Sequence, residues 1–284
     1  MKNREVLKQK GVLNIKNVIE TELLERAKSA IEKRLAETSN SDVLITPQNS
    51  VRKICYAFEK DEVFLDIISH PNVICILKSI YGDDIENILP TWEDILIKQP
   101  KTGIPVEIHQ DLGLQSVNLG DVFSLDFHFH DTVDNPVCFF EGSHKFGAIT
   151  REQIKQYQSK ELYEPYLSLA GDVDIHNVLT LHYSEPNATE KPRYTWYVEF
   201  RTLKQIVEDS LWNEEWALQR QAILLYAIES RKSKGMPFEE IEFSRKAELT
   251  KYLNDIQLRI PHETDSVKYT DNEYNHFADH KTLF

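Results

Sequence analysis

The stretch from about residue 88 to residue 202 is broken into short runs that suit extended strands. In the first run Ile95 and Ile97 alternate with other side chains, and the run ends at a Pro-Lys-Thr-Gly turn. The further runs cover residues 106–109, 122–130, 137–140, 172–181 and 193–201. Alternation of period two is typical of strands, and several short strands separated by turn residues indicate an antiparallel sandwich or barrel. The chain is therefore expected to have a mainly β core.

Helical patterns precede this region. Residues 11–15 alternate like a short strand, and Thr21 is placed to cap a helix whose apolar residues keep helical spacing. A second helical pattern covers residues 64–80. We expect it to break at His70-Pro71, because proline cannot continue a helix, and to end at Gly82.

The remaining stretches are helical or polar. Residues 38–50 are polar and are predicted to form a loop, and the polar tail at 262–284 is expected to be loosely ordered. Between them, apolar residues from 206 to 224 are spaced as in an amphipathic helix. We predict a single domain, residues 1–284, with three parts: an N-terminal strand and helices at 1–87, the β core at 88–202, and a C-terminal helical extension at 203–284.

Composition excludes several functional classes. A net charge of −13 argues against nucleic-acid binding, because no basic excess is present to neutralise phosphates. The charged start lacks the apolar stretch of a signal peptide, and no run reaches the length of a membrane span. Three scattered cysteines without CxxC spacing favour neither a disulfide scaffold nor a zinc ribbon. The expected setting is the cytoplasm, as a monomer or homodimer.

Three residues far apart in the chain have the chemistry of a metal site. His109 and Asp111 are two residues apart, so on an extended strand their side chains point to the same face. His182 stands at the end of the strand-like run 178–181. Two histidines and one carboxylate on one side of a cation leave its other side open, which suits non-haem Fe(II) and O₂ chemistry. We predict that these three residues bind iron.

Arg193 and Thr195 are candidates for binding a cosubstrate. An oxygenase that uses 2-oxoglutarate must hold the far carboxylate of that molecule, and a guanidinium does this with a bidentate fork. Arg193 lies near the start of the strand-like run 193–201, and Thr195 shares its strand face. The alternative is that Arg193 is an ordinary residue at a strand edge.

Four motifs follow one another in the chain: HQDL at 109–112, GSHKFG at 142–147, HYSEPN at 182–187, and Arg193. Together they resemble the motifs of the phytanoyl-CoA dioxygenase-like (PhyH) family of Fe(II)- and 2-oxoglutarate-dependent oxygenases. The segment 109–112 (HQDL) is similar to the family's first ligand segment, and 142–147 (GSHKFG) to its GSHxxG turn. The segment 182–187 (HYSEPN) is similar to its H-x-S-x-x-N segment, and Arg193 falls where the family's 2-oxoglutarate-binding arginine is expected. The resemblance extends over about residues 11–202.

The resemblance implies a double-stranded β-helix (jelly-roll, cupin-like) core. It also implies Fe(II) as cofactor, 2-oxoglutarate and O₂ as cosubstrates, and a reaction in which 2-oxoglutarate is decarboxylated while a C–H bond is oxidised. Ile108 departs from the family pattern, which has tryptophan before the first ligand. The run 126–130 (DFHFH) is also unusual, because the family is apolar or aromatic there. Asp126, His128 and His130 share one face, which either lines a polar pocket or faces solvent.

The substrate is constrained only weakly by the sequence. The acidic groups near the motifs, Glu107, Asp126 and Glu141, favour a cationic or amine-bearing small molecule. The candidates are small polar metabolites, amino acids and natural-product intermediates. Glu107, Asp126 and His128 are the candidate substrate residues. Hydroxylation of an aliphatic C–H bond is the expected reaction, with oxidative cyclisation or desaturation by the same site as alternatives. Two other classes stay open, a non-catalytic jelly-roll binding protein and a zinc hydrolase. A rival zinc cluster of His128, His130 and Asp131 lacks a second ligand pair at structural spacing.

Overall fold

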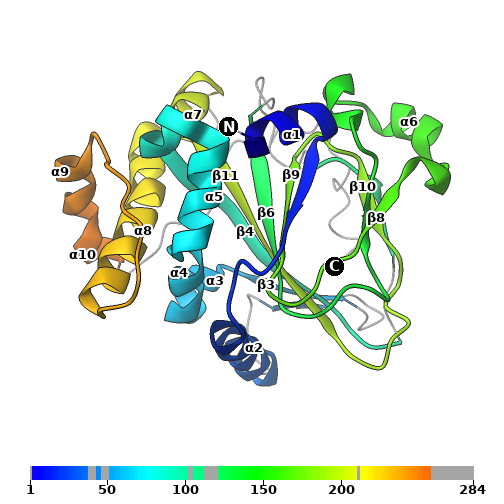
Figure 1. Ribbon diagram of the computed structural model, residues 1–284, viewed down its shortest axis with the longest axis horizontal. Helices are drawn as coiled ribbons and strands as arrows, with labels where there is room; N and C mark the ends of the chain where they lie inside the picture. Colours follow the sequence, from blue (N-terminus) through cyan, green and yellow to red (C-terminus); the bar gives the residue numbers. More distant parts are fainter. Residues whose placement is uncertain are drawn as a thin grey trace.

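Two antiparallel sheets form a sandwich with helices on one side (Figure 1). The computed structural model describes residues 2–37, 43–45, 51–101, 105–111, 121–209 and 212–256. The larger sheet has strand order β1-β9-β6-β11-β4-β3-β2, and the smaller has order β5-β10-β7-β8. The strands are β1 Val12–Ile15, β2 Val43–Ile45, β3 Val51–Cys55, β4 Ile88–Lys98, β5 Val106–His109, β6 Phe123–His128, β7 Val137–Phe139, β8 Glu164–Tyr166, β9 Val173–Asn177, β10 His182–Ser184 and β11 Arg193–Thr202. The expected mainly β core is confirmed.

The larger sheet has one apolar and one polar face, set by the alternation along its central strand β11. Trp196 lies opposite Phe127 of β6 and Ile95 of β4, and all three are buried in the hydrophobic core. The next residues along β11 alternate with them: Thr195 lies opposite His128, and Tyr197 lies opposite Asp126. Because side chains alternate along a strand, the polar residues share the other face, which is turned toward the smaller sheet.

Helices cover the apolar face, with α4, α5 and α8 lying along it (Figure 1). A single hydrophobic cluster joins these helices to the sheet and includes residues from Leu7 to Leu249. The helices are α1 Lys2–Lys10, α2 Thr21–Ala36, α3 Ala57–Lys60, α4 Glu62–Ile68, α5 Pro71–Tyr81, α6 Arg151–Ile154, α7 Leu203–Asp209, α8 Glu214–Ser233, α9 Lys246–Leu249 and α10 Leu253–Ile256. Since both flanks share one core with the sheet, we propose that they form one domain.

Helix ends follow local chemistry, with one exception to the sequence prediction. The break in the second helical pattern is confirmed, because α4 ends at Ile68 and α5 begins at Pro71. His70 caps α5 by accepting a hydrogen bond from the Asn72 amide at 3.2 Å, and Gly82 ends the helix. The capping role predicted for Thr21 was wrong: Thr21 is the first residue of α2, and Glu20 is the N-cap without a side-chain hydrogen bond.

No single helix in the described ranges is long and apolar enough to cross a membrane. The segments Glu62–Ile68 and Pro71–Asn87 meet that measure only as a pair, with a bend of 48° between them. Both segments contribute buried residues to the hydrophobic core.

Some short elements have no clear sequence pattern of their own. The loop predicted at 38–50 contains β2, whose Leu44 pairs with Lys53 of β3; the rest of that range, like the tail at 262–284, lies outside the described residues. The charged start forms α1, which is anchored by the buried side chain of Leu7. A strand of three residues is too short to show an alternating pattern, so β2 could not be predicted from the sequence. It forms because it pairs with β3, and α1 is held in place because Leu7 packs into the core.

The strand predicted at 172–181 is shorter than expected: β9 covers only Val173–Asn177, and residues 178–181 form a turn that leads to β10 in the other sheet. β9 ends at Asn177, whose side-chain oxygen accepts a hydrogen bond from the Leu179 amide at 2.9 Å. The Thr180 amide donates to the Asn177 carbonyl at 2.8 Å. This turn, which the Asn177 side chain supports, ends strand β9 of the larger sheet. The chain then continues into β10 of the smaller sheet, which begins at His182. His182 therefore begins a strand and does not follow one.

We expect Phe127→Ala to lower the free energy of unfolding by about 3–5 kcal/mol, because it removes a buried ring and leaves a cavity. Phe127 is 1% exposed and packs against Trp196 with ring centroids 5.2 Å apart. Phe146→Ala is the matched control, since Phe146 is 47% exposed, and it should cost about 1 kcal/mol. Urea unfolding of both variants measures the difference, and equal losses would contradict this description of the core.

Candidate metal centre

The pairing of β5 with β10 brings two histidines together. His109 lies directly opposite His182 in the antiparallel register, and the ring centroids are 4.1 Å apart. The Nδ1 atom of His109 is 2.7 Å from the Glu107 carbonyl, and that of His182 is 3.0 Å from the Thr180 carbonyl. A carbonyl oxygen only accepts, so Nδ1 carries a proton in both rings, and Nε2 is the nitrogen that faces Asp111. This is how a protein orients a histidine for a metal.

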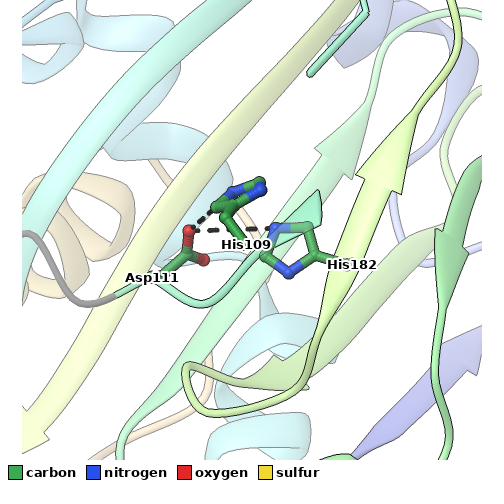
Figure 2. Close-up of side chains that lie close together, drawn as sticks. All are labelled: His109, Asp111 and His182. Carbon is green, nitrogen blue, oxygen red and sulfur yellow. Dashed lines mark ion pairs between the residues drawn. The ribbon is translucent and has the colours of Figure 1, made fainter. Parts of the chain in front are cut away.

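Asp111 completes the group from just beyond the end of β5. Its Oδ1 atom is 3.3 Å from Nε2 of His109 and 3.8 Å from Nε2 of His182 (Figure 2). One ligand atom from each of the three residues lies within 4.8 Å of the others. No other group of histidines, cysteines and carboxylates in the described part of the chain has this spacing. The predicted convergence of the three residues is therefore what the structure shows.

The protonation states also suit a cation. Burial, together with the nearby His109, lowers the pKa of His182 to about 3, so this imidazole is neutral. Burial alone would raise the pKa of the Asp111 carboxyl. The surrounding histidines outweigh burial and hold that pKa well below its ordinary value, so the carboxylate is ionised. A neutral imidazole and an ionised carboxylate are the forms that bind metals.

Gln110 lies between the two ligands in sequence and fixes three chain segments. Its Nε2 atom donates to the Leu179 carbonyl at 2.7 Å and to the Gly147 carbonyl at 2.9 Å, and its Oε1 atom accepts from the Ile149 amide at 3.0 Å. The Asp111 amide adds a bond to the Val178 carbonyl at 2.9 Å. The segment that carries His109 and Asp111 is thus tied to the turn before His182.

The turn at 142–147 holds the backbone next to His182. Ser143 accepts a hydrogen bond from the Leu181 amide at 2.8 Å and donates to the Phe140 carbonyl at 2.6 Å. Gly142 adopts a φ of 83°, in the left-handed region that favours glycine. The GSH segment therefore holds the residue next to His182, and its own histidine, His144, contacts the Lys8 carbonyl instead of the site.

Arg193 and Thr195 leave two buried donors available. Arg193 is 4% exposed, and its Nη1 atom donates to the Asn135 carbonyl at 2.5 Å. Its Nη2 atom and the Thr195 hydroxyl are buried without a hydrogen-bond partner. An unsatisfied buried donor costs about 1–3 kcal/mol, so two of them on one strand face fit an anion such as a carboxylate.

Lys98 is a buried lysine beside Arg193 that the sequence analysis missed. It lies opposite Arg193 in the sheet, and its Nζ atom donates to the Ser184 hydroxyl at 2.7 Å and to the Ser184 carbonyl at 3.1 Å. Burial, with a further contribution from Arg193, lowers the pKa of Lys98 to about 6. Asn187 donates to the Lys98 carbonyl at 3.1 Å. The serine and asparagine of the H-x-S-x-x-N segment therefore hold Lys98.

The polar run on β6 lies inside the sandwich. Asp126 and His128 are 0% and 1% exposed, which decides against the solvent-facing alternative. His128 pairs with Asp174 of β9 at 2.8 Å, while its Nδ1 atom is buried without a partner. His130 accepts from the Tyr194 amide at 3.3 Å, so the rival zinc cluster does not form in the described residues. Glu107, by contrast, is exposed on β5.

His176 on β9 was not predicted to take part in the site. Its Nε2 atom is 2.8 Å from Oδ2 of Asp111, and its Nδ1 atom is 2.9 Å from Oδ2 of Asp126. Burial lowers the pKa of His176, but the two carboxylates outweigh it and raise the pKa to about 10. The only sequence signal was its period-two spacing from Asp174, which gives no hint of the partner Asp111.

Comparison with known proteins agrees with this geometry. Residues 7–195 match the family model of phytanoyl-CoA dioxygenase (PhyH). No curated protein sequence matches the chain significantly.

Several solved structures share the fold at low sequence identity. The non-haem α-ketoglutarate-dependent epimerase SnoN from nogalamycin biosynthesis is 14% identical, with a TM-score of 0.59, over 71% of this chain and 82% of that one. The carbocyclase SnoK from the same biosynthesis is 20% identical, with a TM-score of 0.59, over 70% and 83%. EctD from S. alaskensis, solved with 2-oxoglutarate and 5-hydroxyectoine, is 14% identical, with a TM-score of 0.62, over 72% and 76%. These matches confirm the jelly-roll core.

The family match covers most of the chain and includes both ligand segments and Arg193. The residues present also suit the iron and the 2-oxoglutarate with which these enzymes work, as the orientation of the two histidines and the unpaired donors on β11 show. The chain belongs to the phytanoyl-CoA dioxygenase (PhyH) family and is a non-haem iron, 2-oxoglutarate-dependent enzyme.

Proposed function

We propose that His109, Asp111 and His182 bind Fe(II), and that Arg193 and Thr195 hold the far carboxylate of 2-oxoglutarate. The observation that carries the first assignment is the convergence of three ligand atoms within 4.8 Å, with both imidazoles oriented by backbone carbonyls. The second assignment rests on the two buried, unpaired donors of β11. Two imidazoles and one carboxylate leave coordination positions for the cosubstrates.

The protein's part in the reaction is to bind and to orient. Iron and 2-oxoglutarate, when bound with O₂, supply the oxidising chemistry and yield succinate and CO₂. His109 and His182 are held by backbone carbonyls, so their rings keep one direction. Arg193 is fixed through Nη1 to the Asn135 carbonyl, and its unpaired Nη2 atom would donate to the carboxylate of 2-oxoglutarate. Little reorganisation is then needed when the cosubstrate binds.

We further propose that the substrate is a small polar metabolite whose aliphatic C–H bond is hydroxylated. The buried polar face of β6 and β9 supports this class, because it gives the inside of the sandwich a polar wall. Asp126 and Asp174 are each paired with a histidine, so the wall does not require a cationic substrate. Asp126 and His128 would contact the substrate from within this wall, whereas Glu107 would contact it from its exposed position on β5.

Cyclisation and desaturation are the second candidates for the reaction. They need only a different fate for the same substrate radical. Support comes from the fold's neighbours, which include a carbocyclase and an epimerase as well as an enzyme solved with a hydroxylated compound. Product analysis after turnover separates these outcomes.

Removal of a ligand should abolish metal binding. We expect anaerobic Fe(II) with 2-oxoglutarate to give a weak visible charge-transfer band in the wild-type protein and no band in Asp111→Ala or His182→Ala, because each variant lacks one of three ligands. Asp134→Ala is the matched control, since Asp134 is an exposed carboxylate, and should keep the band. Bands of equal strength in all variants would exclude this metal site.

Changes at the anion site should weaken 2-oxoglutarate binding. We expect Arg193→Ala to raise the Kd for 2-oxoglutarate by about 10–100-fold, the equivalent of about 1.5–3 kcal/mol for hydrogen bonds to a charged group. Arg193→Lys should lie between, because lysine keeps the charge and loses the fork, and Thr195→Val should have a smaller effect. Titration of the charge-transfer band measures the affinity, and an unchanged Kd in Arg193→Ala would remove this residue from the site.

Substrate turnover should couple O₂ uptake to succinate formation. We expect a panel of small polar metabolites to contain molecules that raise both rates together, and acyl-CoA esters to fail, because the sequence shows no additional basic cluster for their phosphates. An oxygen electrode and succinate quantification measure the coupling. Selective oxidation of the esters would reverse the proposed substrate class.

A further inference from the structure

We infer that His176, held in place by Asp126, is a positioning residue that fixes Asp111 so that one defined carboxylate oxygen faces the metal. The inference rests on the proposed function, because it assigns a role toward the iron bound by His109, Asp111 and His182. It concerns two side chains, on β9 and β6, that are not ligands themselves.

The two oxygens of Asp111 have different surroundings. Oδ2 lies 2.8 Å from Nε2 of His176, while Oδ1 faces the two ligand imidazoles at 3.3 and 3.8 Å. A hydrogen bond to Oδ2 therefore sets the rotation of the carboxylate and leaves Oδ1 as the oxygen directed at the ion. A carboxylate that bound through both oxygens would occupy one more position, which a site for 2-oxoglutarate and O₂ needs to keep open.

His176 is itself held from behind. Its Nδ1 atom is 2.9 Å from Oδ2 of Asp126, and Oδ1 of Asp126 accepts a hydrogen bond from the Ser124 hydroxyl at 2.6 Å. His176 and Asp126 are both 0% exposed, and Ser124 is 4% exposed. The ring also lies against Phe139, with centroids 5.3 Å apart. Ser124, Asp126, His176 and Asp111 are thus linked by hydrogen bonds in that order. The His176 ring cannot turn without breaking its bonds to Asp126 and Asp111.

This arrangement uses the polar character of the larger sheet's inner face. Ser124 lies opposite His176, and Asp126 lies two residues further along β6, opposite Asp174 of β9. A carboxylate that hydrogen-bonds a metal ligand does not touch the metal itself. Its removal usually weakens metal binding by about 10–100-fold. Here the outer partner of the ligand is an imidazole, and the carboxylate stands behind it.

The competing explanation is structural: His176 fills space and satisfies Asp126. Two amide substitutions separate these roles. The Nε2 atom of glutamine in His176→Gln can take the place of the ring nitrogen that faces Asp111. The Nδ2 atom of asparagine in His176→Asn can take the place of the ring nitrogen that faces Asp126, and it leaves Asp111 Oδ2 without its donor.

The experiment is a Co(II) titration of the full chain, followed by visible absorption, with wild type, both amide variants and Asp111→Ala. Positioning predicts a Kd close to wild type for His176→Gln and about 10–100-fold weaker binding for His176→Asn, with a changed cobalt spectrum in the latter. Thermal unfolding of the metal-free proteins shows whether the variants are folded. A His176→Asn variant with wild-type affinity and spectrum, or with losses matched by His176→Gln, would overturn the inference.

Two further comparisons keep the result decisive. If either amide variant does not fold, Asp126→Ala takes its place, because it removes the acceptor that holds His176. Weaker Co(II) binding by a folded Asp126→Ala supports positioning, while unchanged binding overturns it. Asp111→Ala distinguishes a failure of the proposed metal site from a failure of the role of His176. Wild-type Co(II) affinity in Asp111→Ala would contradict the proposed metal site itself, whereas its loss beside an intact His176→Asn would reject only the role of His176.

Discussion

The antiparallel pairing of β5 with β10 is the constraint on which the site depends. Residues directly opposite each other in such a pair lie about 5 Å apart, so the register alone brings His109 and His182 within reach of one ion. A shift by one residue would turn one of the two rings to the other face of the sheet. The hydrogen bonds of Gln110 and Ser143 to backbone groups around residues 179–181 fix this register.

The larger sheet shows how a polar interior can be built at moderate cost. Its apolar face packs on the helices, while the opposite face buries carboxylates and imidazoles that would be costly alone. Most of these groups are paired: Asp174 with His128, and Asp126 with His176. The Arg193 Nη2 atom and the Thr195 hydroxyl have no such partner, and the proposed carboxylate of 2-oxoglutarate would supply one.

Much of this arrangement could be predicted from the sequence, because it rests on local pattern. The alternation near Ile95 and the break at Pro71 required no tertiary information. The ligands were found through residue chemistry and motif order. Other features depend on the fold: β2 and β8 are too short to show a period, and Asn177 ends a run that looks continuous. His176 and Lys98 gain their importance from partners on other strands, which no spacing within the sequence indicates.

The motif residues Gln110 and Ser143 support the candidate metal site mainly through bonds to backbone atoms. Gln110 and Ser143 bond to the main chain at Leu179, Gly147, Ile149 and Leu181, and the two ligand imidazoles bond to main-chain carbonyls. A bond to a backbone atom places no demand on the side chain of the partner. The surrounding sequence can therefore change almost entirely, as in neighbours of 14–20% identity that keep the fold. Asp126 and His176 on the inner face of β6 and β9 differ from these residues, because their hydrogen bonds join two side chains and therefore require a specific residue at both positions.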